Sequence, residues 1–172
     1  MADNIVAGES KILCRQSMKY TTSDRRSETD VYFEAPPGLA ALLVRFSYFP
    51  KNTDDHAICK PLIDGCFDLY WNTGLPRPDW REFLPLDNLI TISLDHEGCF
   101  AGCAHRHAKE QCHVISAAHS SPGFHLQPAL EGRWRAVISL HEIVTPSVQA
   151  DIEIEGVCAT DWQERRAVFE NA

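Results

Sequence analysis

The sequence predicts an all-β domain in which two antiparallel sheets pack face to face as a jelly-roll-like sandwich. Three observations carry this prediction. Apolar residues recur at every second position over much of the chain. The alternating runs are short and are separated by turns rich in Gly and Pro, and no regular alternation of strands with helices is present. A short helix is expected at the C-terminus.

The length of 172 residues suits one folded unit, because domains commonly span roughly 100–200 residues. A chain of this size buries about two-thirds of the surface that its unfolded state exposes, so its core needs no disulfide or metal to form. We expect a loose N-terminal arm over 1–10, the sandwich over 11–156, and a C-terminal tail over 157–172 that docks as a short helix.

Several strands follow from a period of two. In the segment 42–48, the apolar Leu42, Val44 and Phe46 alternate with the polar Arg45 and Ser47. The segments 31–35 and 90–94 alternate in the same way. Further strands are expected at 11–20, 58–63, 67–71 and 111–116.

Two strands are expected late in the chain. The run from Trp134 to Val144 is long, apolar and β-branched, which is typical of a well-covered strand. In the run from Val148 to Glu155, apolar and polar residues alternate strictly, which is typical of a strand with one buried and one solvent-exposed face. Thr145-Pro146-Ser147 between them is turn-like, so the two runs are predicted to form a hairpin.

Two stretches depart from the strand pattern. The segment 75–87 contains three prolines and little alternation, so an irregular connection is expected there, with one helical turn at 79–83. The tail from Thr160 is predicted to be a helix capped by Thr160 or Asp161. Its apolar residues for docking would be Trp162, Val168 and Phe169.

Charge and composition limit the partners. The chain has 16 basic and 24 acidic residues, a net charge of −8, which disfavours binding to a polyanion such as nucleic acid. No apolar run approaches the roughly 20 residues that span a bilayer, and the N-terminus lacks a signal-peptide pattern. An odd count of seven cysteines then indicates reduced thiols. We expect a cytoplasmic protein without nucleic-acid or membrane partners.

The segment from Cys99 to His125 concentrates potential metal ligands. Thiolates and imidazoles are the usual ligands of zinc. The candidate ligands are Cys99, Cys103, His105, His107, Cys112 and His113. Their spacing matches no standard zinc finger or ribbon. The alternative interpretation is a histidine-rich sheet face with scattered cysteines and no cofactor.

No complete catalytic constellation emerges. Cys112 and His113 are neighbours, so on a strand they would point to opposite faces and could not form a nucleophile–base pair. The chain has no G-x-S-x-G elbow and no phosphate-binding glycine motif. We therefore predict no catalytic residue. A bound ligand is expected instead to meet a loop-rich face formed by His105, Arg106, His107 and Ser121.

Two further hypotheses concern binding. An exposed tryptophan on a sandwich stacks well on a sugar, so Trp71, Trp80 and Trp162 allow a carbohydrate-binding module, whereas Trp134 begins an apolar strand and is expected in the core. One side of that strand is more apolar than is usual for a solvent-exposed face. Burial of this side against a second copy of the chain would form a homodimer. The residues of this side are Val137, Ser139, His141 and Ile143.

Several short motifs resemble those of a known family. The strand 89–95 is followed by Gly98, Phe100, Gly102 and Arg106, and later come Ser121-Pro122-Gly123-Phe124 and the glycine–tryptophan segment 130–138. Together with 31–38 and 44–48, these segments are similar to the N-terminal β-sandwich accessory domain of some bacterial PHP-type metal-dependent phosphoesterases. The resemblance covers most of 28–155, with 59–87 as an insertion and Cys103 at a position where a tryptophan is usual.

The resemblance implies the sandwich and not the phosphoesterase activity. Only sixteen residues follow Gly156, too few for the catalytic domain. His105-Arg106-His107 resembles the metal-binding H-x-H of a PHP active site, but it lies inside the segment that resembles the accessory domain. The resemblance therefore assigns no catalytic residue to this chain. The leading hypothesis is a non-catalytic binding module with a protein, small-molecule or carbohydrate ligand. The alternatives are a metal-binding protein or metal-dependent hydrolase built on Cys99–His113, and a carbohydrate-binding module.

Overall fold

The computed structural model describes residues 10–71, 74–104 and 107–170, with only the backbone of 168–170. Eight long strands form the body. They are β1 (Lys11–Thr21), β2 (Ser27–Ala35), β3 (Leu39–Phe49), β6 (Leu89–His96), β7 (Cys99–Ala104), β8 (Glu110–Ser116), β9 (Gly132–Glu142) and β10 (Ser147–Cys158). The other elements are the short strands β4 (Asn52–Thr53) and β5 (Leu86–Asp87), the helices α1 (His56–Tyr70) and α2 (Ala159–Glu170), and the 3-10 turns η1 (Thr22–Asp24) and η2 (Trp80–Phe83).

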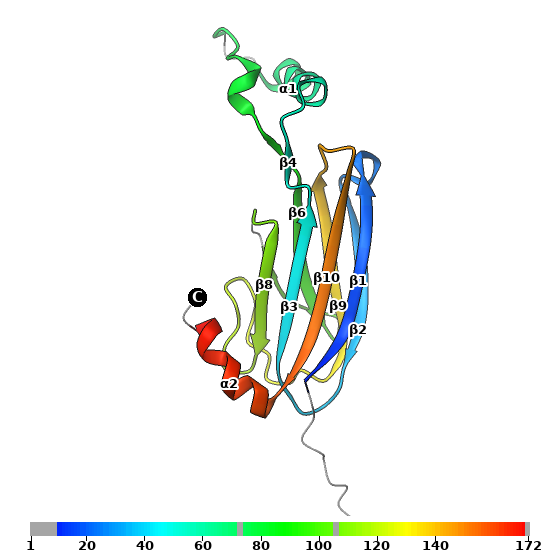
Figure 1. Cartoon of the computed structure of the whole chain (residues 1–172), viewed down its shortest axis with the longest axis vertical. Coiled ribbons are helices and arrows are strands. Elements are labelled where there is room, and N and C mark those ends of the chain that lie inside the picture. Colours follow the sequence, from blue (N-terminus) through cyan, green and yellow to red (C-terminus); the bar gives the residue numbers. More distant parts are fainter. Residues whose placement is uncertain (1–9, 72–73, 105–106, 171–172) are drawn as a thin grey trace, which may run out of the picture.

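The body is an antiparallel two-sheet sandwich, which confirms the predicted fold class. Sheet A has the strand order β1-β10-β3-β8, and sheet B has the order β2-β9-β6-β7. Figure 1 shows the two layers stacked, with sheet A in front. Consecutive strands cross from one sheet to the other several times, so most neighbours within a sheet are distant in sequence. β10 extends through Cys158, two residues beyond the expected sandwich boundary.

The core lies between the sheets and follows the period of two. Val31, Phe33 and Ala35 of β2 are buried while Tyr32 and Glu34 are exposed. Trp134 of β9 is completely buried, stacks on Phe33 with ring centroids 6.0 Å apart, and donates a hydrogen bond from Nε1 to the Leu130 carbonyl at 2.8 Å. The indole therefore buries a large apolar area without leaving its polar atom unpaired.

The predicted hairpin between the last two long strands is wrong. β9 belongs to sheet B and β10 to sheet A, so their connection crosses between the layers. Ile143 and Val144 in this connection are buried, and the side-chain oxygen of the buried Asn88 accepts a hydrogen bond from the Val144 amide at 2.8 Å. A turn-like sequence indicates a change of direction but does not tell whether the chain stays in one sheet.

The strands predicted at 58–63 and 67–71 are also wrong, because residues 58–70 lie in α1 and Trp71 is the C-cap of this helix. The side chain of Asp55 caps the helix by accepting a hydrogen bond from the Ala57 amide at 2.9 Å. Cys59, Ile63 and Phe67 recur every four residues and form its buried face. Around them pack Trp71, Trp80, Leu84 and Leu86.

These residues form a small separate unit, the lobe, which comprises residues 51–71 and 74–87 and projects beyond one end of the sandwich (Figure 1). The helical turn predicted at 79–83 is confirmed as η2, and Asp79 caps it by accepting from the Arg81 amide at 3.0 Å. This hydrogen bond lowers the pKa of Asp79. The lobe thus has helix caps and a small apolar cluster of its own.

Asn88 joins the lobe to the sandwich and is completely buried. Its side-chain nitrogen donates to the Pro50 carbonyl at 2.8 Å and to Thr145 Oγ1 at 2.9 Å. Its backbone amide donates to the Lys51 carbonyl at 2.8 Å. One side chain therefore fixes the chain entering the lobe, the chain leaving it, and the crossing from β9 to β10.

The C-terminal helix is confirmed as α2, although it begins at Ala159, one residue before the predicted cap. Trp162 is buried, as expected, against Ala41, Leu43, Val114 and Val157 on the outer face of sheet A. The predicted docking residues Val168 and Phe169 lie outside the residues whose side chains are described. None of the described helices is long and apolar enough to cross a membrane.

Candidate functional site

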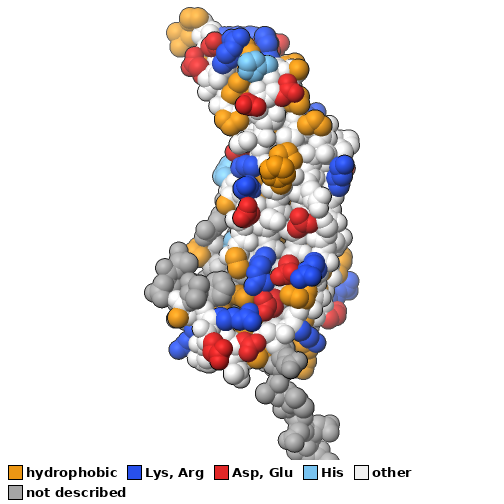
Figure 2. Space-filling view, viewed as in Figure 1, with side chains coloured by type: hydrophobic (Ala, Val, Ile, Leu, Met, Phe, Trp, Pro, Cys, Tyr) orange, Lys and Arg blue, Asp and Glu red, His pale blue; other side chains and the backbone are white. Residues whose placement is uncertain are grey.

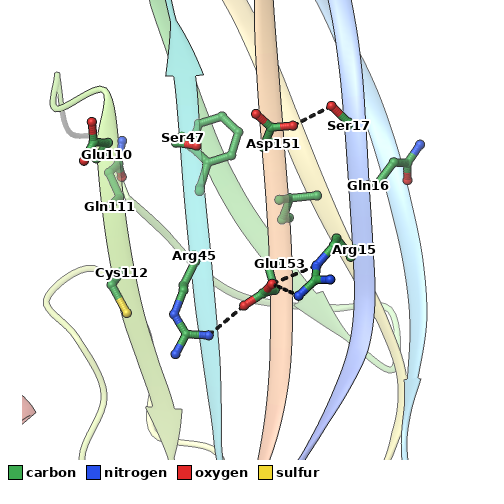
Figure 3. A pocket seen from close by; sticks show the side chains of 12 residues that line it. Arg15, Gln16, Ser17, Arg45, Ser47, Glu110, Gln111, Cys112, Asp151 and Glu153 are labelled. Atoms are coloured by element: carbon green, nitrogen blue, oxygen red, sulfur yellow. Dashed lines mark hydrogen bonds and ion pairs between the residues drawn. The ribbon is translucent and has the colours of Figure 1, made fainter.

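The part of the outer face of sheet A that α2 leaves open carries a groove of about 690 Å³, which we call the sheet A groove. All four strands of the sheet contribute to it, and Figure 3 shows the lining side chains from close by. The lining residues are Arg15, Gln16, Ser17, Arg45, Phe46, Ser47, Glu110, Gln111, Cys112, Asp151, Ile152 and Glu153.

One row of side chains, three charged and one a thiol, crosses the groove. Arg15, Glu153, Arg45 and Cys112 are neighbours in the strand register, on β1, β10, β3 and β8 in turn. Register neighbours on one face have Cβ atoms only about 4.5–5.5 Å apart. Arg15 Nε donates to Glu153 Oε2 at 2.8 Å, and Arg45 Nη1 donates to Glu153 Oε1 at 2.9 Å (Figure 3). Glu153 is therefore held by an arginine on each side.

The ion pairs continue from the groove to α2. Arg45 Nη1 also donates to Glu155 Oε2 at 2.9 Å, and Arg165 Nη1 of α2 donates to Glu155 Oε1 at 2.7 Å. The hydrogen bond from Arg15 is the main cause that lowers the pKa of Glu153, and Arg45 acts in the same direction. Glu153 and Glu155 together therefore compensate the charges of these arginines.

A second row, parallel to the first, offers hydroxyl and carboxylate groups. Ser17, Asp151, Ser47 and Glu110 are neighbours in the register across the same four strands. Ser17 Oγ donates to Asp151 Oδ1 at 2.5 Å, and Gln149 Nε2 donates to Ser17 Oγ at 2.8 Å. These hydrogen bonds place donors and acceptors at fixed positions beside the groove.

The groove continues into a smaller hollow of about 280 Å³ that shares Ser47, Glu110 and Asp151 with it. This hollow is lined by Phe49, which is 70% exposed, and the Lys109 ammonium lies 6.0 Å from the centre of its ring. Acidic and basic side chains are interspersed over this face (Figure 2). The face therefore combines a mixed polar surface with one exposed aromatic ring.

Cys112 is the thiol of the first row. Desolvation in the groove raises its pKa, and this exceeds the lowering caused by the nearby Arg45 guanidinium. The thiol therefore stays protonated near neutral pH, whereas the thiolate is the nucleophile and the metal ligand. The arrangement does not activate this cysteine.

The three cysteines of the predicted zinc set and His113 are divided between the two sheets. Cys99 and Cys103 lie on β7 of sheet B, whereas Cys112 and His113 lie on β8 of sheet A. Cys112 points outward as expected, while His113 is buried, with Nε2 3.0 Å from Gln111 Oε1 and its ring 5.0 Å from the Phe124 ring. His107 is exposed, and His105 lies outside the described residues. Among the residues that the structure describes, no three His, Cys, Asp or Glu side chains gather as a metal site requires.

The predicted ligand-binding set is described only in part. His105 and Arg106 lie outside the described residues, and His107 is exposed in the connection between β7 and β8. Ser121 is half-buried against β8: its Oγ accepts from the Val114 amide at 2.9 Å, and its own amide donates to the Val114 carbonyl at 2.8 Å. β8 is the edge strand of sheet A, and Ser121 pairs with its exposed backbone groups. Ser121 therefore has a structural role, because the unpaired edge strand of a sheet needs such cover.

The glycine motifs behind the family resemblance have structural roles. Gly102 and Gly123 lie where the segment around Phe124 crosses β7, and both have positive φ, 132° and 98°. A Cβ on Gly102 would lie 2.4 Å from the Gly123 carbonyl oxygen, and one on Gly123 would lie 2.2 Å from the Cys103 carbonyl oxygen. Only glycine permits this approach of two backbones.

The tryptophans do not line the sheet A groove. Trp134 and Trp162 are buried, and Trp71 and Trp80 pack in the apolar cluster of the lobe. The side of β9 considered for a dimer is partly covered as well. Val137 and Ile143 are 6% and 1% exposed, and Ser139 and His141 form hydrogen bonds with Glu28 and Thr91.

No family model matches the chain, and no curated protein matches it in sequence. The sheet A groove could not be predicted from the sequence, because its first row joins residues 15, 45, 112 and 153, which are brought together only by strand register. A local signal was present nevertheless. Polar residues alternate with the core residues on β1, β3 and β10, and charges recur at every second position along β10.

Proposed function

We propose that the protein is a non-catalytic binding module with a jelly-roll arrangement, and that the sheet A groove is its ligand surface. The strand orders β1-β10-β3-β8 and β2-β9-β6-β7 support the jelly roll, in which eight strands wind into two four-stranded sheets. The resemblance to an accessory sandwich domain favours the same non-catalytic role.

The chemistry of the groove supports binding over catalysis. Cys112 is the thiol of the groove and stays protonated, and its neighbour His113 points into the core, away from it. Ser17 donates to Asp151 and has no histidine between itself and the carboxylate, so it lacks the base that activates a serine. The polar groups of the groove are arranged to form hydrogen bonds.

The charge of the groove favours a neutral ligand. Its lining contains two arginines and three carboxylates, and both arginines form ion pairs within the protein. A polyanion would gain little in the groove, because both arginines are already paired with a carboxylate. A polycation would have to compete with those arginines for the carboxylate. Ser17, Ser47, Asp151 and Gln149 remain as hydrogen-bonding groups for hydroxyls. The ligand class that fits best is a neutral carbohydrate.

The observation that carries this proposal is the exposed ring of Phe49 at the end of the groove, beside the row of serines and carboxylates. A sugar ring has an apolar face that stacks on an aromatic ring and hydroxyls that need polar partners. Phe49 therefore supplies the stacking ring that was expected of a tryptophan.

The test is calorimetric titration of the protein with neutral cello-, xylo- and malto-oligosaccharides. We expect one series to bind, and Phe49→Ala to weaken that binding about tenfold, the upper range for one aromatic contact. Asp151→Asn should weaken it as well, because a charge-assisted acceptor is lost. Phe100→Ala is the matched control, since Phe100 is 56% exposed but lies on β7 of the other sheet.

Two outcomes would contradict the proposal. If none of the oligosaccharides binds, the carbohydrate assignment is wrong. If Phe49→Ala and Phe100→Ala weaken binding equally, the ligand does not occupy the sheet A groove.

A further inference from the structure

A second cavity lies where the lobe meets the end of the sandwich, and we call it the junction pocket. Its volume is about 400 Å³, within the range of about 300–1,000 Å³ that is usual for small-molecule sites. It shares no lining residue with the sheet A groove. Its lining comprises Arg25, Arg26, Leu62, Ile63, Cys66, Phe67, Phe83, Leu86, Asp87, Glu142 and Val144.

The floor of the junction pocket is apolar. α1 contributes Leu62, Ile63 and Phe67, η2 contributes Phe83, and the sandwich contributes Val144. Phe83 is 45% exposed although its ring packs edge-on against Phe67 with centroids 5.4 Å apart. A floor of this kind gains free energy when an apolar ligand removes it from water.

The rim of the pocket is charged, and its charges are unevenly compensated. Arg25 lies 3.7 Å from Glu142, and Asp87 lies 3.1 Å from the Lys51 ammonium. Arg26 has no ion-pair partner within the described part of the chain. After the internal pairs are counted, the rim offers one uncompensated guanidinium.

The backbone holds Arg26 in an uncommon conformation. Its φ is 62°, in the left-handed region that residues other than glycine rarely adopt, and its amide donates to the Leu140 carbonyl at 2.6 Å. Such strain persists only where the surrounding structure imposes it, and it is concentrated at functional sites. The turn between η1 and β2 thus presents Arg26 at the pocket in a fixed backbone geometry.

We propose that the junction pocket binds an aliphatic monocarboxylate, with the alkyl chain on the apolar floor and the carboxylate on Arg26. A carboxylate matches the planar fork of a guanidinium and accepts two parallel hydrogen bonds from it. A single uncompensated cation selects a monoanion over a polyanion such as a nucleotide. This site is independent of the sheet A groove, so either proposal stands if the other fails.

The first experiment uses Cys66, which lines the pocket and is exposed, as a reporter. Decanoate below its micellar concentration is added to the full chain, and the rate of thiol alkylation is followed at each cysteine by mass spectrometry. Bound decanoate should slow alkylation of Cys66 about tenfold, because a pocket covers most of its ligand and excludes the reagent. Cys99 and Cys112 are exposed internal controls on the sandwich, and their rates should not change.

The second experiment separates the role of the carboxylate from that of the alkyl chain. Arg26→Gln should weaken decanoate binding about tenfold, in keeping with the loss of a charge-assisted hydrogen bond, and should leave the binding of the uncharged analogue decanol unchanged. Lys11→Gln is the matched control, since Lys11 is an exposed cation at the opposite end of β1 from the pocket. Cys66→Trp should block both ligands by filling the cavity without changing a charge.

The result that overturns the proposal is equally defined. Absence of Cys66 protection, or equal protection of Cys66, Cys99 and Cys112, would show that decanoate does not bind in the junction pocket. Unchanged decanoate affinity in Arg26→Gln would show that the arginine does not receive the carboxylate.

Discussion

The sandwich and the lobe are built from the same chain but are stabilised differently. The main core of the sandwich unites 25 buried residues from both sheets. In the described part of the lobe, the buried cluster consists of Cys59, Ile63 and Phe67, with four half-buried neighbours. Among the residues that the structure describes, nine large apolar side chains are exposed, and four of them belong to the lobe: Leu69, Tyr70, Leu75 and Phe83. The sandwich therefore supports its own fold, whereas the lobe depends on its attachment.

Hydrogen bonds attach the lobe to the sandwich. Asn88 bonds to both chain connections of the lobe, and the Lys51 ammonium donates to Tyr48 Oη and to the Asn88 carbonyl, each at 3.1 Å. A unit with few buried apolar contacts opens locally at a lower free energy than the core to which it is joined. We therefore expect the lobe to open at a lower free energy than that of unfolding the sandwich.

The largest effect is expected from Trp134→Ala in the sandwich. The indole is completely buried between Phe33 and His96, with ring centroids 6.0 Å and 4.2 Å away. Its removal should lower the free energy of unfolding by about 3–5 kcal/mol, from lost burial and a residual cavity. Urea unfolding followed by far-UV circular dichroism measures this, and hydrogen exchange should accelerate in both sheets and in the lobe together.

A smaller and local effect is expected from Phe67→Ala in the lobe. Phe67 joins Ile63, Trp71 and Phe83, and its loss should lower the free energy of local opening by about 2–3 kcal/mol, below the usual range because the site is small and partly open. Hydrogen exchange in α1 should accelerate while that of β3, β9 and β10 stays constant. Tyr70→Ala on the same helix is the control, since Tyr70 is 77% exposed. Equal acceleration in the sandwich would show that the two regions unfold as one unit.

The same contrast explains what could be predicted from sequence. In the sandwich, one buried face imposes strict alternation, as in Val31–Phe33–Ala35, so the strands and the fold class could be read directly. In the lobe, strands are expected at 58–63 and 67–71, although the spacing of Cys59, Ile63 and Phe67 and the capping Asp55 indicate a helix. A short apolar segment is ambiguous when its periodicity is read over too few positions.

The sites were harder to predict, for a different reason. Arg15, Arg45 and Glu153 are separated by up to 138 residues and form one row only because β1, β10 and β3 pair in a particular register. The cluster around Cys99–His113 is conspicuous because its residues are close in sequence. Cys112 and His113 nevertheless point to opposite faces of sheet A, and Cys99 and Cys103 lie in sheet B. Closeness in sequence is a weak guide to a site on a sandwich whose consecutive strands change sheets.

The smallest effect is expected on the surface of the sandwich, at the ion pair between Arg15 and Glu153. Arg15→Gln should lower the free energy of unfolding near neutral pH by only about 0.2–1 kcal/mol, because the pair is exposed to solvent and screened by salt. Lys19→Gln, on the same face of β1, is the control and should be neutral. Urea unfolding of the three proteins over a range of pH measures the difference.

The pH dependence identifies the origin of that small effect. Arg15 lowers the pKa of Glu153 below its ordinary value of 4.5, so the unfolded chain takes up the proton first as the pH falls. The stabilisation is therefore complete above that ordinary value and is lost as the pH falls through the folded-state pKa. The difference between wild type and Arg15→Gln should vanish over this acidic interval and shrink at high salt. A difference that persisted in acid would mean that Arg15 stabilises the sandwich through the packing of its aliphatic stem and not through its charge.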